Sequence, residues 1–214
     1  MKKIIIILLI LALGIASVYA QEAQGSQDNQ GGEEYIAPKK NTFWGFSINF
    51  GLSRLSIPDN VTTIKSTSPG FDWGLHLNAS FYISGSPIGL NFSIGIERLS
   101  GTFNYYSGQE LTMKSTLIPI HLGLAVRSGG IFVNAGLSIA AQPKLTATSA
   151  TLSMVANDAR TPLTGIYINL GYRVALGRMY IPIGLEFTYY FTNIAESTQG
   201  DKWLQLNLKV GIEF

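Results

Sequence analysis

The chain has 214 residues, of which 46% are hydrophobic and only 13% are charged. This charged share is about half of the roughly 25% found in soluble proteins. The sequence contains no cysteine, which excludes disulfide bonds and a lipid-modified N-terminal cysteine. It has 15 basic and 13 acidic residues and therefore lacks the basic excess that a nucleic-acid partner would require.

Residues 1–20 have the three parts of a secretory signal peptide. Lys2 and Lys3 precede the apolar run "IIIILLILALGI", and small residues end the segment before Gln21. This order predicts cleavage after Ala20, and we prefer it to a membrane-anchor helix because the apolar run is short. Residues 21–41 are polar and rich in Gln and Gly, which predicts a flexible periplasmic lead-in.

From residue 42 onward, apolar and polar residues alternate with the period of two that is typical of β-strands. Each alternating segment is about as long as a strand that crosses a bilayer at a tilt, and no apolar run reaches the length of a membrane helix. We therefore predict an all-β fold, an eight-stranded antiparallel up-and-down transmembrane barrel over residues 42–214. The eight segments are 43–53, 71–83, 88–97, 117–126, 131–142, 165–176, 179–191 and 202–214.

The connections between these segments alternate in length. Tight turns are predicted at "SGSP", "RSGG" and "LGRM", where Gly or Pro suits a hairpin. Long polar connections are predicted at 54–70, 99–115, 142–162 and 193–201. Outer-membrane barrels combine short periplasmic turns with long extracellular loops. The aromatic residues of "FNYYSGQ" are expected either to contact an extracellular ligand or to extend a hairpin.

Composition indicates that the apolar faces of the strands point outward. The polar faces are rich in glycine and carry few charges, whereas a solvated surface would carry many Lys and Glu side chains. Five or six large apolar side chains per strand would also overfill the interior of an eight-stranded barrel. If the apolar faces contact lipid, the barrel must close, because an open strand edge would leave backbone N–H and C=O groups without hydrogen-bond partners. Aromatic residues near strand ends predict a girdle: Phe43, Trp44, Trp73, Tyr180, Tyr189 and Phe191.

The inward phase also carries charges, which allow two interpretations. Two histidines with carboxylates could form a metal site or an acid–base pair. Alternatively, the charges pair with one another and fill the lumen, which we prefer because no histidine pair has metal-ligand spacing in the sequence, so no cofactor is expected. We expect Glu186 beside Asn169 and in contact with Lys209, with His76 within reach of Glu97. The predicted lumen network is Asp72, His76, Glu97, His121, Arg127, Arg173, Glu186, Lys209 and Glu213.

The signal peptide, the eight alternating segments and the terminal "VGIEF" together resemble the outer membrane β-barrel family of the OmpX and OmpA transmembrane-domain type over residues 42–214. The resemblance implies residence in the outer membrane of a double-membraned bacterium, among its lipids, with a plugged lumen. It also implies that Phe214 is the signal read by the barrel assembly machinery. The peptidoglycan-binding domain that follows the barrel in OmpA is not expected here.

The predicted function is that of an integral outer-membrane barrel with a structural or surface-interaction role, and not an enzyme. A small pore is the main alternative, because many inward glycines could admit water. A barrel enzyme that modifies lipid A is less favoured. Neither histidine lies on the lipid-facing phase, and no serine is close to a histidine in the sequence. Fold alone does not assign a function.

Overall fold

The structure is a computed structural model that describes residues 41–57, 61–150, 153–156, 162–194 and 201–214. The predicted signal peptide and nearly all of the lead-in lie outside these residues. The described strands are β1 (Thr42–Leu55), β2 (Ile64–Tyr82), β3 (Ile88–Tyr105), β4 (Glu110–Ser128), β5 (Ile131–Thr148), β6 (Ser153–Ala156), β7 (Leu163–Leu176), β8 (Met179–Tyr190) and β9 (Trp203–Glu213).

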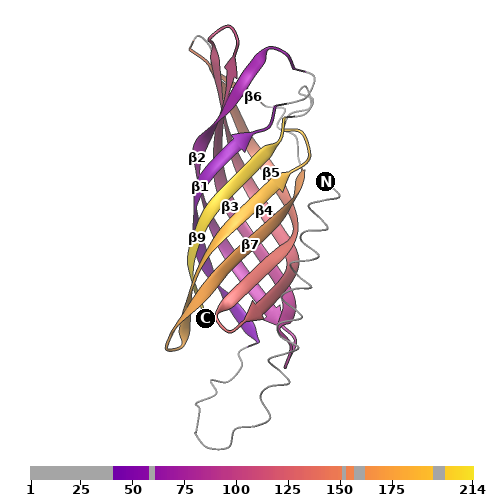
Figure 1. Ribbon diagram of the computed structural model, residues 1–214, viewed down its shortest axis with the longest axis vertical. Coiled ribbons are helices and arrows are strands. Elements are labelled where there is room, and N and C mark those ends of the chain that lie inside the picture. The colour runs from indigo at the N-terminus through magenta and orange to yellow at the C-terminus, as the bar shows by residue number, and fades with distance from the viewer. Residues whose placement is uncertain (1–40, 58–60, 151–152, 157–161, 195–200) are drawn as a thin grey trace, which may run out of the picture. The chain divides into compact units, whose positions relative to one another are not determined.

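Eight of the strands close into a ring, as Figure 1 shows. Each of these strands pairs antiparallel with its two neighbours. The ring closes where β1, which also pairs with β2, pairs with β9 along a ladder from Gly45↔Glu213 to Leu55↔Trp203. The short strand β6 pairs antiparallel with the far end of β5. The prediction of an eight-stranded antiparallel barrel is confirmed. No helix in the described ranges has the length and apolar content needed to span a membrane.

The alternation in the sequence separates an apolar exterior from a polar interior. Leu90, for example, is 62% exposed, while its neighbour Asn91 is buried. The exterior of β1 shows Phe46, Ile48 and Phe50 in succession, between inward-facing serine and asparagine residues. Large apolar side chains facing outward around a polar lumen are the arrangement of a transmembrane barrel of the outer-membrane type.

The three tight turns lie where the sequence predicts them, between β2 and β3, between β4 and β5, and between β7 and β8. Gly85, Gly129 and Gly177 adopt positive φ angles of 74°, 53° and 63° in these turns. Side chains rarely allow this conformation, which accounts for the glycines. We call this end of the barrel, which also holds the C-terminus, the turn end.

At the opposite end, three of the four predicted long connections are wrong in extent, whereas the one at 193–201 lies between β8 and β9 as predicted. β3 and β4 continue as a paired ladder as far as Asn104↔Glu110, so only a short turn separates them, and β5 continues to Thr148. The expectation that "FNYYSGQ" extends a hairpin is the one that the structure supports. We call the paired segments 64–70, 99–105, 110–116 and 144–148 the extension.

The polarity of the two faces is exchanged within the extension. In β3 the outward residues change from Phe92 and Ile96 to Arg98 and Thr102, while the inward residues change from Glu97 to Leu99 and then Phe103. The strand pleat is unbroken, so the exchange reflects a change of surroundings, from lipid to water. The expectation of a lumen that is polar throughout is therefore corrected: at this end it holds an apolar cluster of Leu55, Leu99, Phe103, Met113, Leu117, Ala140, Leu145, Leu163, Tyr190, Ile194 and Trp203.

Candidate functional site in the barrel lumen

The lumen is filled in three layers, and the first lies at the turn end. Arg173 donates from Nε to Glu213 Oε2 at 2.6 Å and from a terminal nitrogen to the Tyr82 hydroxyl at 3.2 Å. Its guanidinium also lies 4.6 Å from the centre of the Phe43 ring. Arg127 lies 4.1 Å from the Tyr82 ring. Two predicted lumen cations thus occupy an aromatic layer that closes this end.

Two predicted girdle residues, Phe43 and Tyr180, belong to this layer. Phe43 is 5% exposed and packs edge-on against Tyr82 and Tyr180 inside the barrel. The assignment of both residues to the outer girdle is wrong, because the pleat turns every second residue inward: Phe43 lies on the same phase of β1 as Asn49, and Tyr180 lies on the same phase of β8 as Glu186. The residue after Phe43, Trp44, is exposed and its ring lies 5.2 Å from that of Phe214.

The middle layer is polar, and Glu186 on β8 lies within it. Lys209 Nζ is 2.9 Å from Glu186 Oε2, and Asn49 Nδ2 donates to Glu186 Oε1 at 2.8 Å. Asn169 is the register partner of Glu186 on β7. Asn49 reaches Glu186 from β1, on the far side of β9. The carboxylate is therefore held by side chains from two other strands, β9 and β1.

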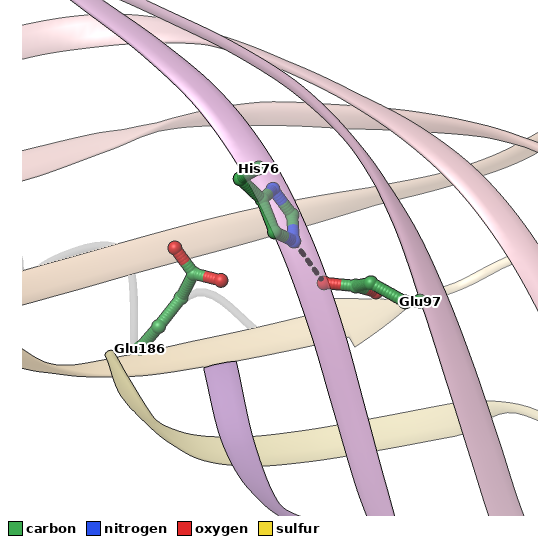
Figure 2. A group of neighbouring side chains, drawn as sticks. All are labelled: His76, Glu97 and Glu186. Atoms are coloured by element: carbon green, nitrogen blue, oxygen red, sulfur yellow. Dashed lines mark hydrogen bonds and ion pairs between the residues drawn. The ribbon is translucent and has the colours of Figure 1, made fainter. Parts of the chain in front are cut away.

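A second group in the middle layer is centred on His76 of β2. Its Nε2 lies 3.0 Å from Glu97 Oε1, and its Nδ1 lies 3.1 Å from Ser93 Oγ. Gln205 of β9 donates to the other oxygen of Glu97 at 3.0 Å. Figure 2 shows the imidazole of His76 facing the carboxylate of Glu97, with Glu186 approaching from β8. One ligand atom each from His76, Glu97 and Glu186 lie within 4.8 Å of one another.

His121 of β4 completes this part of the layer. It is 1% exposed, and its ring lies 5.7 Å from that of His76 and stacks on Tyr167 at 4.5 Å. Neither of its ring nitrogens has a hydrogen-bond partner among the described residues. Tyr167 itself donates its hydroxyl to Asn91 at 3.0 Å, across the lumen from β7 to β3.

Asp72 is the remaining predicted member, and it is 1% exposed. The amide nitrogen of Asn207 faces both of its carboxylate oxygens when the Asn207 side chain is oriented to donate. The structure thus brings Asp72, His76, Glu97, His121, Glu186 and Lys209 into one layer. It places Arg127, Arg173 and Glu213 separately, at the turn end.

Sequence reasoning missed the uncharged members of the middle layer. Asn49, Ser93, Tyr167, Gln205 and Asn207 are all buried and all lie on the inward phase of their strands. That phase was the available signal. Their partners could not be read from it, because contacts such as Gln205 with Glu97 cross between strands that are not neighbours in the ring.

Comparisons with known proteins bear on the fold only. A scan against protein-family models and a search of curated protein sequences gave no match. Among solved structures, Ail of Yersinia pestis is 16% identical, covering 82% of this chain and 100% of that chain, with a TM-score of 0.45. Neisserial surface protein A is 11% identical with the same coverages and a TM-score of 0.45. OprG of Pseudomonas aeruginosa is 11% identical, covering 81% and 96%, with a TM-score of 0.42.

These similarities are distant, and the assignment rests on the strand pairing and the two faces of the barrel. A closed ring of eight antiparallel strands has no free edge, and its exterior is apolar over the length of a membrane crossing. The chain is an outer-membrane β-barrel protein.

Proposed function

We propose that this chain is a closed barrel that anchors a folded extension outside the cell, and that the extension has a structural or surface-interaction role. The observation that carries this proposal is the apolar cluster in the lumen at this end, to which the extension contributes Leu99, Phe103, Met113 and Leu145. Loose loops would not bury Phe103, Met113 and Leu145, so the segments beyond the membrane form a built platform. In this arrangement the turn end faces the periplasm, as short turns do in such barrels.

The filling of the lumen supports closure. Arginines and aromatic rings occupy the turn end, a hydrogen-bonded polar layer occupies the middle, and the apolar cluster occupies the end that leads into the extension. Eight-stranded barrels have interiors that side chains can fill. A pore would require a continuous water path through all three layers. Single-channel recording in planar bilayers tests this: we expect no discrete openings, and a steady ohmic conductance from purified barrel would contradict closure.

The tip of the β3–β4 hairpin is the part of the extension best placed for contact. Tyr106 is 71% exposed there, beyond the end of the apolar cluster. A large exposed aromatic ring at a hairpin tip is suited to binding a partner. The turn residue Gly108, with a φ of 81°, fixes the hairpin geometry around it.

Cell-adhesion measurements test the proposed role. Bacteria that display the chain are compared with bacteria that display Tyr106→Ser, on surfaces coated with matrix proteins, polysaccharides or serum proteins. We expect adhesion to at least one surface that depends on the chain and falls with Tyr106→Ser. Arg178→Ser, at the exposed turn end, is the control. If bacteria with and without the chain adhere equally well, only a structural role remains.

An enzymatic function has one feature in its favour, which the sequence did not reveal. Ser93, His76 and Glu97 form a hydrogen-bonded series like that of a serine hydrolase. However, each is at most 3% exposed in the middle of a filled lumen. A substrate could reach Ser93 only if the layers above or below it opened. We therefore assign the series to the interior network.

A further inference from the structure

We infer that the middle layer binds one divalent transition-metal ion, Zn²⁺, through His76, Glu97 and Glu186, with His121 as the fourth ligand. This metal site is separate from the proposed surface role, which would hold with or without it. Four observations support it: the charge of the layer, the donor set, the orientation of the ligands by their neighbours, and the unsatisfied nitrogens of His121.

The first observation is an imbalance of buried charge. Asp72, Glu97 and Glu186 are each 1% exposed, while Lys209 is the one Lys or Arg that the structure places in contact with these groups. With neutral histidines and all three carboxyl groups ionised, the described part of the layer would have two negative charges more than positive charges. Unbalanced charge in a low-dielectric interior is costly. A single divalent cation would neutralise it.

The second observation is the donor set. Two imidazole nitrogens and two carboxylate oxygens are ligands that zinc binds in tetrahedral sites. The ligand atoms of His76, Glu97 and Glu186 already lie within 4.8 Å of one another. Around a zinc ion with bonds of about 2.0–2.2 Å, such atoms are about 3.3–3.5 Å apart. Small rotations of these three side chains would therefore bring their ligand atoms to zinc-binding distance.

The third observation is that two of the ligands are oriented from behind. Ser93 Oγ lies 3.1 Å from Nδ1 of His76, which leaves Nε2 directed at Glu97. Gln205 donates to Oε2 of Glu97, which leaves Oε1 directed at His76. Hydrogen bonds of this kind from outer groups fix the tautomer of a histidine ligand and the direction of a carboxylate ligand.

The fourth observation is independent of the acidic groups. His121 is buried with both ring nitrogens unsatisfied, although a buried polar group normally has a partner. Its stacking on Tyr167 fixes the plane of its ring next to His76. Ser93, which supports His76, is also the register partner of His121 on the adjacent strand. A bound metal ion would satisfy one nitrogen of His121.

Lys209 would oppose binding of the ion. Its ammonium lies 2.9 Å from Oε2 of Glu186 and competes with a cation for that carboxylate. Removing it should therefore tighten metal binding, whereas a purely structural network would give no such gain. Because layers of side chains fill the lumen on both sides of the site, the ion is expected to enter while the barrel folds.

Refolding with metal tests the site. Mature chain is stripped with chelator in urea, refolded into detergent micelles with or without Zn²⁺, and freed of excess metal by dialysis. Bound zinc is measured by elemental analysis, and Kd by competition with a chromophoric chelator. We expect one zinc per folded barrel. Refolding with Co²⁺ should give the visible absorption of a four-coordinate site.

Variants separate this lumen site from metal bound elsewhere. Glu97→Gln and His76→Gln should each weaken binding by more than about 100-fold, and Ser93→Ala by about 10-fold through the lost orientation. Lys209→Met should strengthen binding. Glu213→Gln is the matched control, because it also removes a buried lumen carboxylate but one that pairs with Arg173 at the turn end.

The results are read only for barrels that pass the heat-modifiability test of folding. Stoichiometric zinc that is lost in Glu97→Gln, kept in Glu213→Gln and tightened in Lys209→Met would support the site. The absence of saturable binding in the unmodified chain would overturn it. Equal binding by Glu97→Gln and Glu213→Gln would also overturn it, as would weaker binding by Lys209→Met.

Discussion

Glu186 and Lys209 show how far single residues could be predicted. The inward phase identifies both, and the hairpin register puts Glu186 opposite Asn169 on β7. On β9 the register partner of Lys209 is Gly184, so its contact with Glu186 is diagonal. Counting from the tight turn therefore reaches Glu186 and Asn169, whereas Lys209 follows the long connection between β8 and β9 and was placed only by its inward phase on the next strand. The contacts of Glu186 with Asn49 and of Glu97 with Gln205 depend on how the ring closes, which no local pattern encodes.

The ion pair gives a prediction at this scale. Glu186→Gln leaves the ammonium of Lys209 buried without its partner, and breaking one half of such a pair costs about 3–5 kcal/mol. The double change Glu186→Gln with Lys209→Met should recover most of the lost free energy of unfolding, because neither charge is then stranded. Urea unfolding from metal-free lipid vesicles measures both. If Glu186→Gln and Lys209→Met each left the free energy of unfolding unchanged, the pair would be solvated.

At the scale of elements, the strands and tight turns were predictable because each follows a local rule. Alternation with a period of two marks the strands, and glycines at positive φ mark the turns. The extension was missed for an equally physical reason. The alternation of β3 continues through Leu99 and Phe103, but there the apolar residues lie on the inward phase. In the membrane-crossing part of β3 the apolar residues lie on the outward phase. Judged by that outward phase alone, the extension resembles a polar connection.

The exchange of polarity places a basic cluster on the outside of three neighbouring strands. Arg98 on β3 and Lys144 on β5 are both register partners of Thr116 on β4. Lys114 precedes Thr116 by two residues on β4, and the side chains of Arg98, Lys114 and Lys144 are all exposed. They follow directly on the lipid-facing residues Ile96 and Ile118. In the proposed orientation, with the turn end in the periplasm, cations at this level of the barrel would face the headgroups of the outer leaflet.

We therefore expect Arg98, Lys114 and Lys144 to bind phosphate groups of anionic outer-leaflet lipids. The triple change to Gln should reduce the phosphorylated lipid that co-purifies with the barrel, since each cation near an anionic surface contributes about 1 kcal/mol. Arg178→Gln, at the turn end, is the control. Phosphorus analysis of the purified protein measures the effect. Equal lipid content in the triple variant and the control would refute the assignment.

At the scale of the whole molecule, orientation in the membrane is open to a direct test. The chain has no cysteine, so single introduced cysteines are labelled without background. Ser107 and Arg178 are exposed at opposite ends of the barrel. In intact cells, an impermeant maleimide should label Ser107→Cys and leave Arg178→Cys unlabelled until the outer membrane is permeabilised. The reverse pattern would invert the topology.

The last residue joins the two ends of the barrel sequence. Phe214 donates its N–H to the Trp44 carbonyl at 2.8 Å, and its own carbonyl accepts from Trp44 at 3.2 Å. Its ring lies against that of Trp44 on the exterior. The final residue is therefore part of the closing seam, and any effect of its loss on assembly in cells must be separated from its contribution to stability.

Phe214→Lys makes that separation, because it keeps the backbone pairing with Trp44 and replaces the aromatic ring with a charged side chain. If Phe214 is the signal read by the assembly machinery, the variant should refold in detergent nearly as well as the unmodified chain. In cells, however, it should yield much less heat-modifiable barrel in the outer membrane. Trp44→Lys is the matched control, since it removes the other ring of the same stack. An equal loss for both variants in cells would mean that the stack, and not recognition of the terminal residue, accounts for the aromatic at the end of the chain.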